Sequence, residues 1–132
     1  MRKGRAVRVR QAVHIRQRTV KVRYTQIPLR PYPGTIKLFR DLPQMRAYYE
    51  AHTGKKYEYA DEATGGRYVR LEGKKEMDTV WIVYARKPHV LAHELTHILL
   101  QLWNEIGAHP ADGNGEPFCY MLSQLMIEAK WK

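Results

Sequence analysis

Hydrophobic and polar positions alternate between residues 5 and 24, apart from a break at Gln17-Arg18-Thr19. The apolar positions on either side of the break are mostly β-branched: Val7, Val9, Val13, Ile15, Val20, Val22 and Tyr24. A period of two with such residues is typical of strands that bury one face. The pattern predicts either one long bent strand or a β-hairpin, with a basic outer face.

Prolines mark the next segment. Residues 25–34 read Thr-Gln-Ile-Pro-Leu-Arg-Pro-Tyr-Pro-Gly, with three prolines and a final Pro-Gly pair. Proline cannot donate a hydrogen bond to a strand ladder, so we expect a connector or a sheet edge here. This boundary divides a basic extended element, residues 1–34, from residues 35–132, within one compact domain overall.

Shorter elements are expected in the middle of the chain. Asp41 is a suitable N-cap for a helix over about 42–52, and Gly54 is a suitable end for it. Apolar residues predict strands at 36–39, around Tyr57 and Tyr59, and at 68–71, with turns at 64–66 and 72–75. Residues 79–84 form an unbroken apolar run, which favours a strand that is covered on both faces.

Two helices are predicted at the C-terminal end. Pro88 opens the first, whose apolar stripe has helical spacing: Leu91, Leu95, Ile98, Leu99 and Leu102. Gly107 and Pro110 are stop signals, and Pro117 stands at the start of a last helix that runs to about residue 130. A short sheet with two or three helices accounts for the whole chain, which indicates an α+β fold.

Length and composition narrow the class of protein. A chain of 132 residues with 44% apolar residues suits a single globular domain. One cysteine excludes an internal disulfide framework. The chain has no apolar run long enough for a membrane span, and its basic start lacks the apolar region of a secretion signal. We therefore expect a cytoplasmic protein.

The net charge of +10 is unevenly distributed. Residues 1–40 contain 12 Lys and Arg and no acid, whereas residues 41–132 contain 11 Lys and Arg against 13 Asp and Glu. Such asymmetry indicates a face that meets nucleic acid, an acidic protein or another subunit. The candidate contacts lie on the expected strands: Arg8, Arg10, Arg16, Arg18, Lys21 and Arg23.

Residues 93–97, His-Glu-Leu-Thr-His, are the strongest chemical signal. On a helix, His93 and His97 lie on one face, one turn apart, so both imidazoles can ligate one Zn²⁺ ion. Glu94 is then placed to act as general base on a water held by the metal. The motif falls on the clearest predicted helix, which is the context that it requires.

A catalytic zinc needs a third protein ligand. Glu116 is the favoured candidate because a second helix can fold back and bring its first residue to the metal; His109 and Asp112 are the alternatives. Tyr120, one turn after Glu116, shares its helix face and is a candidate donor to a developing oxyanion. Cys119 is expected to be a small buried thiol.

At these residues the chain resembles the gluzincin branch of zinc metallopeptidases. The resemblance rests on His93-Glu94-x-x-His97 and Glu116, separated by 18 residues, and covers about residues 79–128. The run Glu116-Pro-Phe-Cys-Tyr-Met-Leu is also similar to a segment of small phage and prophage proteins and of compact ImmA/IrrE-like peptidases. The resemblance implies a compact zincin-like fold, with a small twisted sheet packed against the active-site helix and against a C-terminal helix that carries Glu116. In such a fold one sheet strand borders the cleft and pairs with extended peptide substrate.

The expected function is zinc-dependent hydrolysis of peptide bonds in a protein or peptide substrate, by a phage- or prophage-encoded enzyme. The alternative is a non-catalytic, zinc-stabilised virion, assembly or nucleic-acid-binding protein that uses the basic N-terminal face. A homo-oligomer is compatible with both functions.

Overall fold

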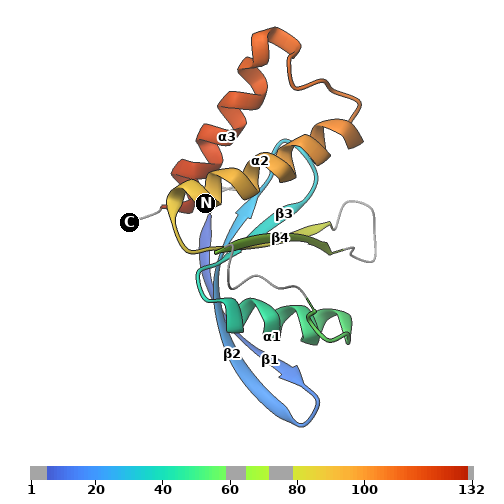
Figure 1. Cartoon of the computed structure of the whole chain (residues 1–132), viewed down its shortest axis with the longest axis vertical. Helices are drawn as coiled ribbons and strands as arrows, with labels where there is room; N and C mark the ends of the chain where they lie inside the picture. Colours follow the sequence, from blue (N-terminus) through green and yellow to red (C-terminus); the bar gives the residue numbers. More distant parts are fainter. Residues whose placement is uncertain (1–5, 59–64, 72–78, 131–132) are drawn as a thin grey trace.

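The computed structural model describes residues 6–58, 65–71 and 79–130. Within these ranges the chain forms a five-stranded mixed sheet with three helices packed against it (Figure 1). The strand order is β1-β2-β3-β5-β4. The expected α+β class is therefore confirmed.

The alternating N-terminal segment forms a β-hairpin, which is one of the two expected arrangements. Strands β1 (Val7–Ile15) and β2 (Arg18–Pro28) pair antiparallel, with Ile15 opposite Arg18, so that Arg16 and Gln17 form the turn. Strand β2 extends to Pro28 and pairs with β3 (Thr35–Phe39). Residues 25–28 are therefore part of a strand and not a connector. Among the described residues, Ile27 and Pro28 pair with β3 alone, which agrees with the other expectation, a sheet edge, where proline is tolerated.

The remaining strands place an edge beside the C-terminal half of the chain. Strand β5 (Val80–Ala85) lies between β3, to which it is parallel, and β4 (Gly66–Leu71), to which it is antiparallel. Residues 81–85 are all buried, as expected for a covered apolar strand. Strand β4 has a partner on one side only and forms an edge of the described sheet.

Helix α1 (Leu42–Thr53) begins and ends where the local signals predict. The Asp41 side chain accepts a hydrogen bond from the Gln44 backbone N–H, and Gly54 closes the helix in the left-handed conformation. Such caps satisfy backbone groups that the helix itself leaves without partners. Helix α1 covers one face of the sheet, where Phe39, Met45 and Tyr48 are buried.

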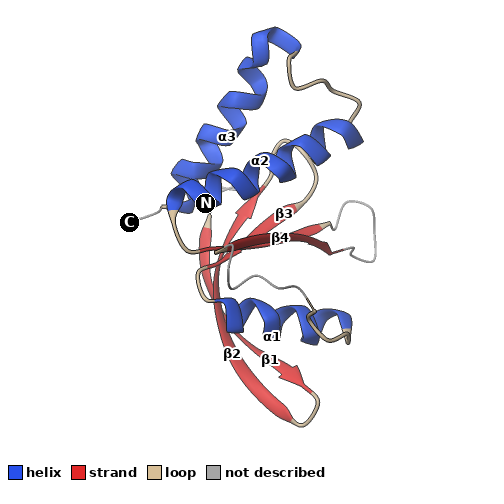
Figure 2. Cartoon of the chain, in the orientation of Figure 1, coloured by secondary structure: helices blue, strands red, loops and turns tan. Residues whose placement is uncertain are grey.

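The opposite face is covered by α2 (Pro88–Glu105) and α3 (Glu116–Ala129), which a loop with a short 3₁₀ turn, η2 (Asp112–Gly115), connects (Figure 2). The five apolar residues of the α2 stripe are all at most 2% exposed. Burying one such side chain contributes roughly 1.5–3 kcal/mol relative to its exposed state. This stripe therefore fixes the rotation of α2 on the sheet.

One predicted element is not observed. Tyr57 is buried, but it lies outside any strand and packs edge-on against Tyr49. Tyr59, Thr64 and the turn expected at 72–75 lie outside the described residues. No helix in the described ranges is long and apolar enough to cross a membrane.

Candidate metal centre

The histidine pair lies on the exposed side of α2. Because the leucine stripe turns inward, His93 and His97 stay at the surface, over the edge strand β4. The Nε2 atoms of His93 and His97 are 3.1 Å apart, and the ring centroids are 4.7 Å apart with an interplanar angle of 77°. Sequence spacing alone predicted that these two imidazoles would meet.

The separation of the two nitrogens fits a shared metal ion. Zinc binds imidazole nitrogen at about 2.0–2.1 Å, so two ligands about 100° apart on one ion are separated by roughly 3.1 Å. The same separation fits a hydrogen bond between two neutral rings, with one nitrogen donating and the other accepting. The pair is therefore arranged so that one zinc ion can replace one shared proton.

Glu94 follows His93 on α2 and, unlike the two histidines, is buried, with only 8% of its surface exposed. It lines a groove of about 510 Å³ together with residues of α2 and β4: Gly66, Arg67, Tyr68, His89, Val90, His93 and His97. A Cβ atom on Gly66 would lie 3.4 Å from Glu94 Oε1 and would clash with Val90 Cγ1. The absence of a side chain at residue 66 thus lets β4 lie close to Val90 of α2 in this groove.

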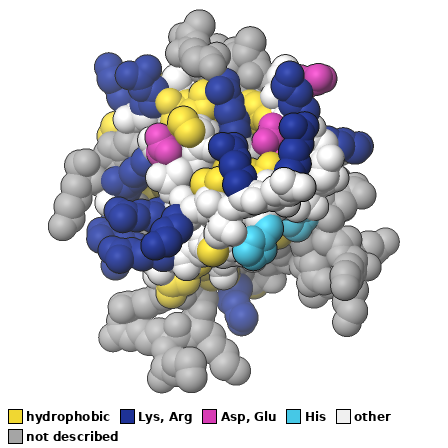
Figure 3. Space-filling view, turned by 90° about the horizontal axis from the view of Figure 1, so that it is seen from below, with side chains coloured by type: hydrophobic (Ala, Val, Ile, Leu, Met, Phe, Trp, Pro, Cys, Tyr) yellow, Lys and Arg dark blue, Asp and Glu magenta, His cyan; other side chains and the backbone are white. Residues whose placement is uncertain are grey.

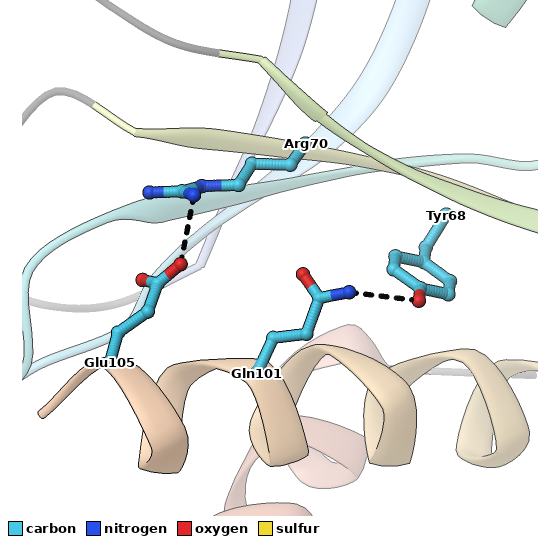
Figure 4. A network of polar contacts seen from close by, with 4 residues as sticks. All are labelled: Tyr68, Arg70, Gln101 and Glu105. Atoms are coloured by element: carbon cyan, nitrogen blue, oxygen red, sulfur yellow. Dashed lines mark hydrogen bonds and ion pairs between the residues drawn. The ribbon is translucent and has the colours of Figure 1, made fainter. Parts of the chain in front are cut away.

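Strand β4 runs along α2 and supports the histidine face. The Tyr68 ring stacks on the His97 ring at 5.3 Å, with an interplanar angle of 17°. The Tyr68 hydroxyl accepts a hydrogen bond from Gln101 Nε2 at 3.1 Å, and Arg70 forms a 2.9 Å ion pair with Glu105 (Figure 4). These contacts connect the strand to successive turns of the helix.

Two groove residues were not predicted as site residues. His89 precedes His93 by four positions, so the same spacing that identified the pair could have identified it. Tyr68 is 29 positions before His97, and no sequence signal indicates that the two rings stack.

The third predicted ligand is not brought to the histidine pair. Glu116 is the exposed first residue of α3, and no group of three or more His, Cys, Asp or Glu side chains in the described ranges is arranged to hold a metal ion. Helix α3 lies on the other side of α2 from strand β4 (Figure 1). The structure therefore brings together His93, Glu94 and His97, without Glu116.

The other candidates near α3 have local roles or point to solvent. The His109 backbone N–H donates to Asp112 Oδ2 at 2.9 Å, and His109 Nδ1 accepts from the Ala111 N–H at 3.0 Å, so both side chains stabilise the loop. Tyr120 is 71% exposed and is not among the groove residues. Cys119 is exposed, so its expected burial is wrong: the buried side of α3 is formed by Met121, Leu125 and Ala129.

The basic N-terminal residues fall into two groups. Arg8, Arg10, Lys21 and Arg23 project from one face of the hairpin, where Arg10 is opposite Arg23. Arg16 lies in the turn with a φ of 55°, and Arg18 is opposite Ile15 and so has the parity of the other face. All six side chains are exposed.

Comparisons with protein-family models, with curated proteins and with solved structures find no significant match to this chain. The groove with His93, Glu94 and His97 is therefore the basis for a proposed function.

Proposed function

We propose that the chain is a zinc-dependent metallopeptidase, with His93 and His97 as zinc ligands and Glu94 as general base. The observation that carries the proposal is the 3.1 Å separation of the two histidine Nε2 atoms beside a buried carboxylate in one groove. A buried glutamate in the same groove makes this arrangement more specific than a surface histidine pair alone.

The side chains of the groove would have separate roles in the reaction. A zinc ion, when bound, supplies Lewis acidity and lowers the pKa of a water in the groove. The Glu94 carboxylate accepts the proton of the attacking water and delivers it to the nitrogen of the leaving amine. The ring of Tyr68 holds His97 by stacking, which keeps its Nε2 directed at His93.

Strand β4 is the proposed binding edge for substrate. It borders the groove through Gly66 and Tyr68, and it is paired with β5 on one side only. An extended peptide can add to such an edge through backbone hydrogen bonds, which would place one peptide bond beside the histidines. The proposed substrate edge is therefore β4, because the buried strand β5 lies inside the sheet between β3 and β4.

Glu116 is proposed as the third ligand on the strength of the gluzincin resemblance. It requires the first turn of α3 to approach α2 when zinc binds. The connection between the helices contains Gly107, Gly113 and Gly115, all with positive φ, where the backbone is least restricted by side chains. Its contribution can be separated from that of the histidine pair by experiment.

Zinc content and peptide cleavage should be measured together on the wild type, Glu94→Gln, His97→Ala and Glu116→Ala. Cleavage can be followed by mass spectrometry on a mixture of unfolded proteins. We expect Glu94→Gln to keep its zinc and to lose roughly 10²–10⁴-fold of the cleavage rate. His97→Ala should lose both zinc and cleavage, and Glu116→Ala should bind zinc more weakly.

Glu105→Gln is the matched control, because Glu105 lies on the same helix but outside the groove and is paired with Arg70. Full cleavage by Glu94→Gln would exclude the proposed mechanism, and full zinc occupancy in His97→Ala would exclude the site. Unchanged zinc affinity in Glu116→Ala would exclude only the resemblance-based third ligand.

A second candidate function is a non-catalytic, zinc-stabilised assembly or binding protein. It is favoured by one observation: the described residues bring two histidine nitrogens together but no third ligand. Zinc binding without cleavage of any peptide by the wild type would support this function over the peptidase.

A further inference from the structure

The β1–β2 hairpin has one basic face that is separate from the histidine groove. Its residues alternate with those packed on α1, and we call them the ribbon face: Arg8, Arg10, Ala12, His14, Thr19, Lys21, Arg23 and Thr25. All but Thr25 are exposed. The opposite face of the hairpin buries Val13, Ile15, Val22 and Tyr24. One side of the hairpin therefore serves the core, and the other is open.

A pocket lies where the ribbon face meets the C-terminal end of α3. It has a volume of about 570 Å³, and four arginines line it: Arg8, Arg10, Arg23 and Arg40. Arg40 follows β3, and its Nη2 donates to the carbonyl oxygens of Ala129 and Lys130 at 3.1 and 3.3 Å. Tertiary packing thus adds a fourth arginine that the sequence pattern did not single out.

Positive charge is crowded in this pocket. Burial, and then the charge of Arg8, lower the pKa of Arg40 from its usual value. Two carboxylates also line the pocket, but each already accepts a backbone hydrogen bond: Asp41 from the Gln44 N–H at 3.3 Å and Glu128 from the Ala6 N–H at 2.9 Å. Within the described segments, Arg8, Arg10 and Arg23 form no ion pair with a carboxylate.

Seen from below the orientation of Figure 1, the surface also carries many cations. In Figure 3, Lys and Arg side chains clearly outnumber Asp and Glu side chains on the face that is in view. The like charges of Arg8, Arg10 and Arg23 repel one another, and an anion with several negative groups relieves this repulsion. The charge pattern therefore indicates a polyanionic partner.

The shape and the side chains of the ribbon face favour duplex DNA over other polyanions. A two-stranded β-ribbon fits the major groove of B-form DNA, whereas the major groove of A-form RNA is too narrow for side chains. Single-strand binding relies on aromatic side chains that stack on bases, and the ribbon face carries no Phe, Tyr or Trp. Residues two positions apart on one face are separated by about 6.6–6.8 Å, which lets successive arginines reach different phosphates.

We propose that the ribbon face and the adjoining arginine pocket bind the phosphate backbone of duplex DNA. Arginine is suited to this contact because its planar guanidinium donates two parallel hydrogen bonds to one phosphate. Phosphate contacts do not read sequence, so the binding is sequence-independent and sensitive to salt. This proposal does not depend on zinc or on the histidine pair.

The experiment measures binding of the full chain to a short fluorescent DNA duplex by anisotropy, over about 50–200 mM salt. The test variant is Arg8→Gln/Arg10→Gln/Arg23→Gln. The control Arg70→Gln/Arg86→Gln/Lys87→Gln removes the same charge from the β4–β5 side of the sheet. We expect the test variant to bind roughly tenfold or more weakly, with a salt slope lower by about 3, since each phosphate contact contributes about 0.9.

The control variant should retain wild-type affinity, and circular dichroism should show that both variants are folded. Equal losses in the two variants would overturn the proposal, because net charge alone would then explain binding. Tighter binding of the matching single strand or of duplex RNA would overturn the assignment to duplex DNA, as would a wild type that binds no duplex at low salt.

Discussion

At Gly66, strand β4 lies directly against helix α2. A Cβ atom at this position would clash with Val90 Cγ1 and would lie 3.2 Å from the Tyr84 carbonyl oxygen. Glycine is needed here for space, because its φ is not in the left-handed region. The close approach of β4 to α2 thus depends on the absence of a methyl group at residue 66.

Gly66→Ala is expected to lower the free energy of unfolding by about 1–3 kcal/mol, the usual cost of overpacking. The measurement is urea unfolding followed by circular dichroism. Val90→Ala removes the atom that clashes, so the double variant should recover part of the loss in a double-mutant cycle. Strictly additive losses would contradict this steric explanation.

Helix α1 and strands β2 and β3 share a cluster of aromatic rings around the amine of Lys37. The rings of Tyr24 and Tyr48 are 5.6 Å apart, edge to face, and Lys37 Nζ donates to the Tyr48 hydroxyl at 2.7 Å. Lys37 Nζ also lies 5.0 and 4.9 Å from the centroids of these two rings. The cluster joins helix α1 to β2 and β3.

Burial raises the pKa of both tyrosines, and the charge of Lys37 partly opposes this shift at Tyr24. In the unfolded chain a tyrosine loses its proton near pH 10. Because the folded state holds the proton to higher pH, the stabilisation is complete below about pH 10 and is lost as the pH rises through the folded pKa values.

Stability measured by urea unfolding should therefore fall above about pH 10, in step with tyrosinate absorbance. In Tyr48→Phe this fall should be shallower, because one of the two shifted groups is removed. Tyr120→Phe is the control, since Tyr120 is 71% exposed, and its profile should match the wild type. A profile in Tyr48→Phe that equals the wild type would contradict the assignment.

At the scale of the whole molecule, the sheet separates two chemically different surfaces. Strand β4 and α2 carry the histidine groove at one edge, and the β1–β2 hairpin carries the basic ribbon face at the other edge. Three strands lie between β1 and β4 in the described sheet. The proposed zinc chemistry and the proposed DNA contact can therefore be removed independently.

Zinc should raise the thermal stability of the whole chain, because an ion that binds only the folded state stabilises it by mass action. The stabilisation is about 2.7 kcal/mol when free zinc is a hundredfold above its Kd. Calorimetry with zinc, and again after chelation, measures the change in Tm. His93→Ala and His97→Ala should lose the zinc response, whereas His14→Ala on the ribbon face should keep it.

Much of the fold was predictable because its signals are local. Asp41 and Gly54 set the ends of α1, and the leucine spacing set the buried stripe of α2. Alternation in residues 5–24 predicted strands with a basic face, and the structure has a hairpin there. The strand expected at Tyr57 was wrong. The ring is buried by packing on Tyr49, and this burial does not require the residue to lie in a strand.

Helical spacing in the sequence was sufficient to predict that His93 and His97 meet on α2, because one helical turn brings them together wherever the helix lies. Which residues surround the histidine pair depends on the tertiary structure. Tyr68 and Gly66 reach the pair through the pairing of β4 with β5, and Glu116 stays apart because α3 packs on another side of α2. Helical period acts over a few residues, whereas these contacts depend on how distant segments bury their apolar faces together.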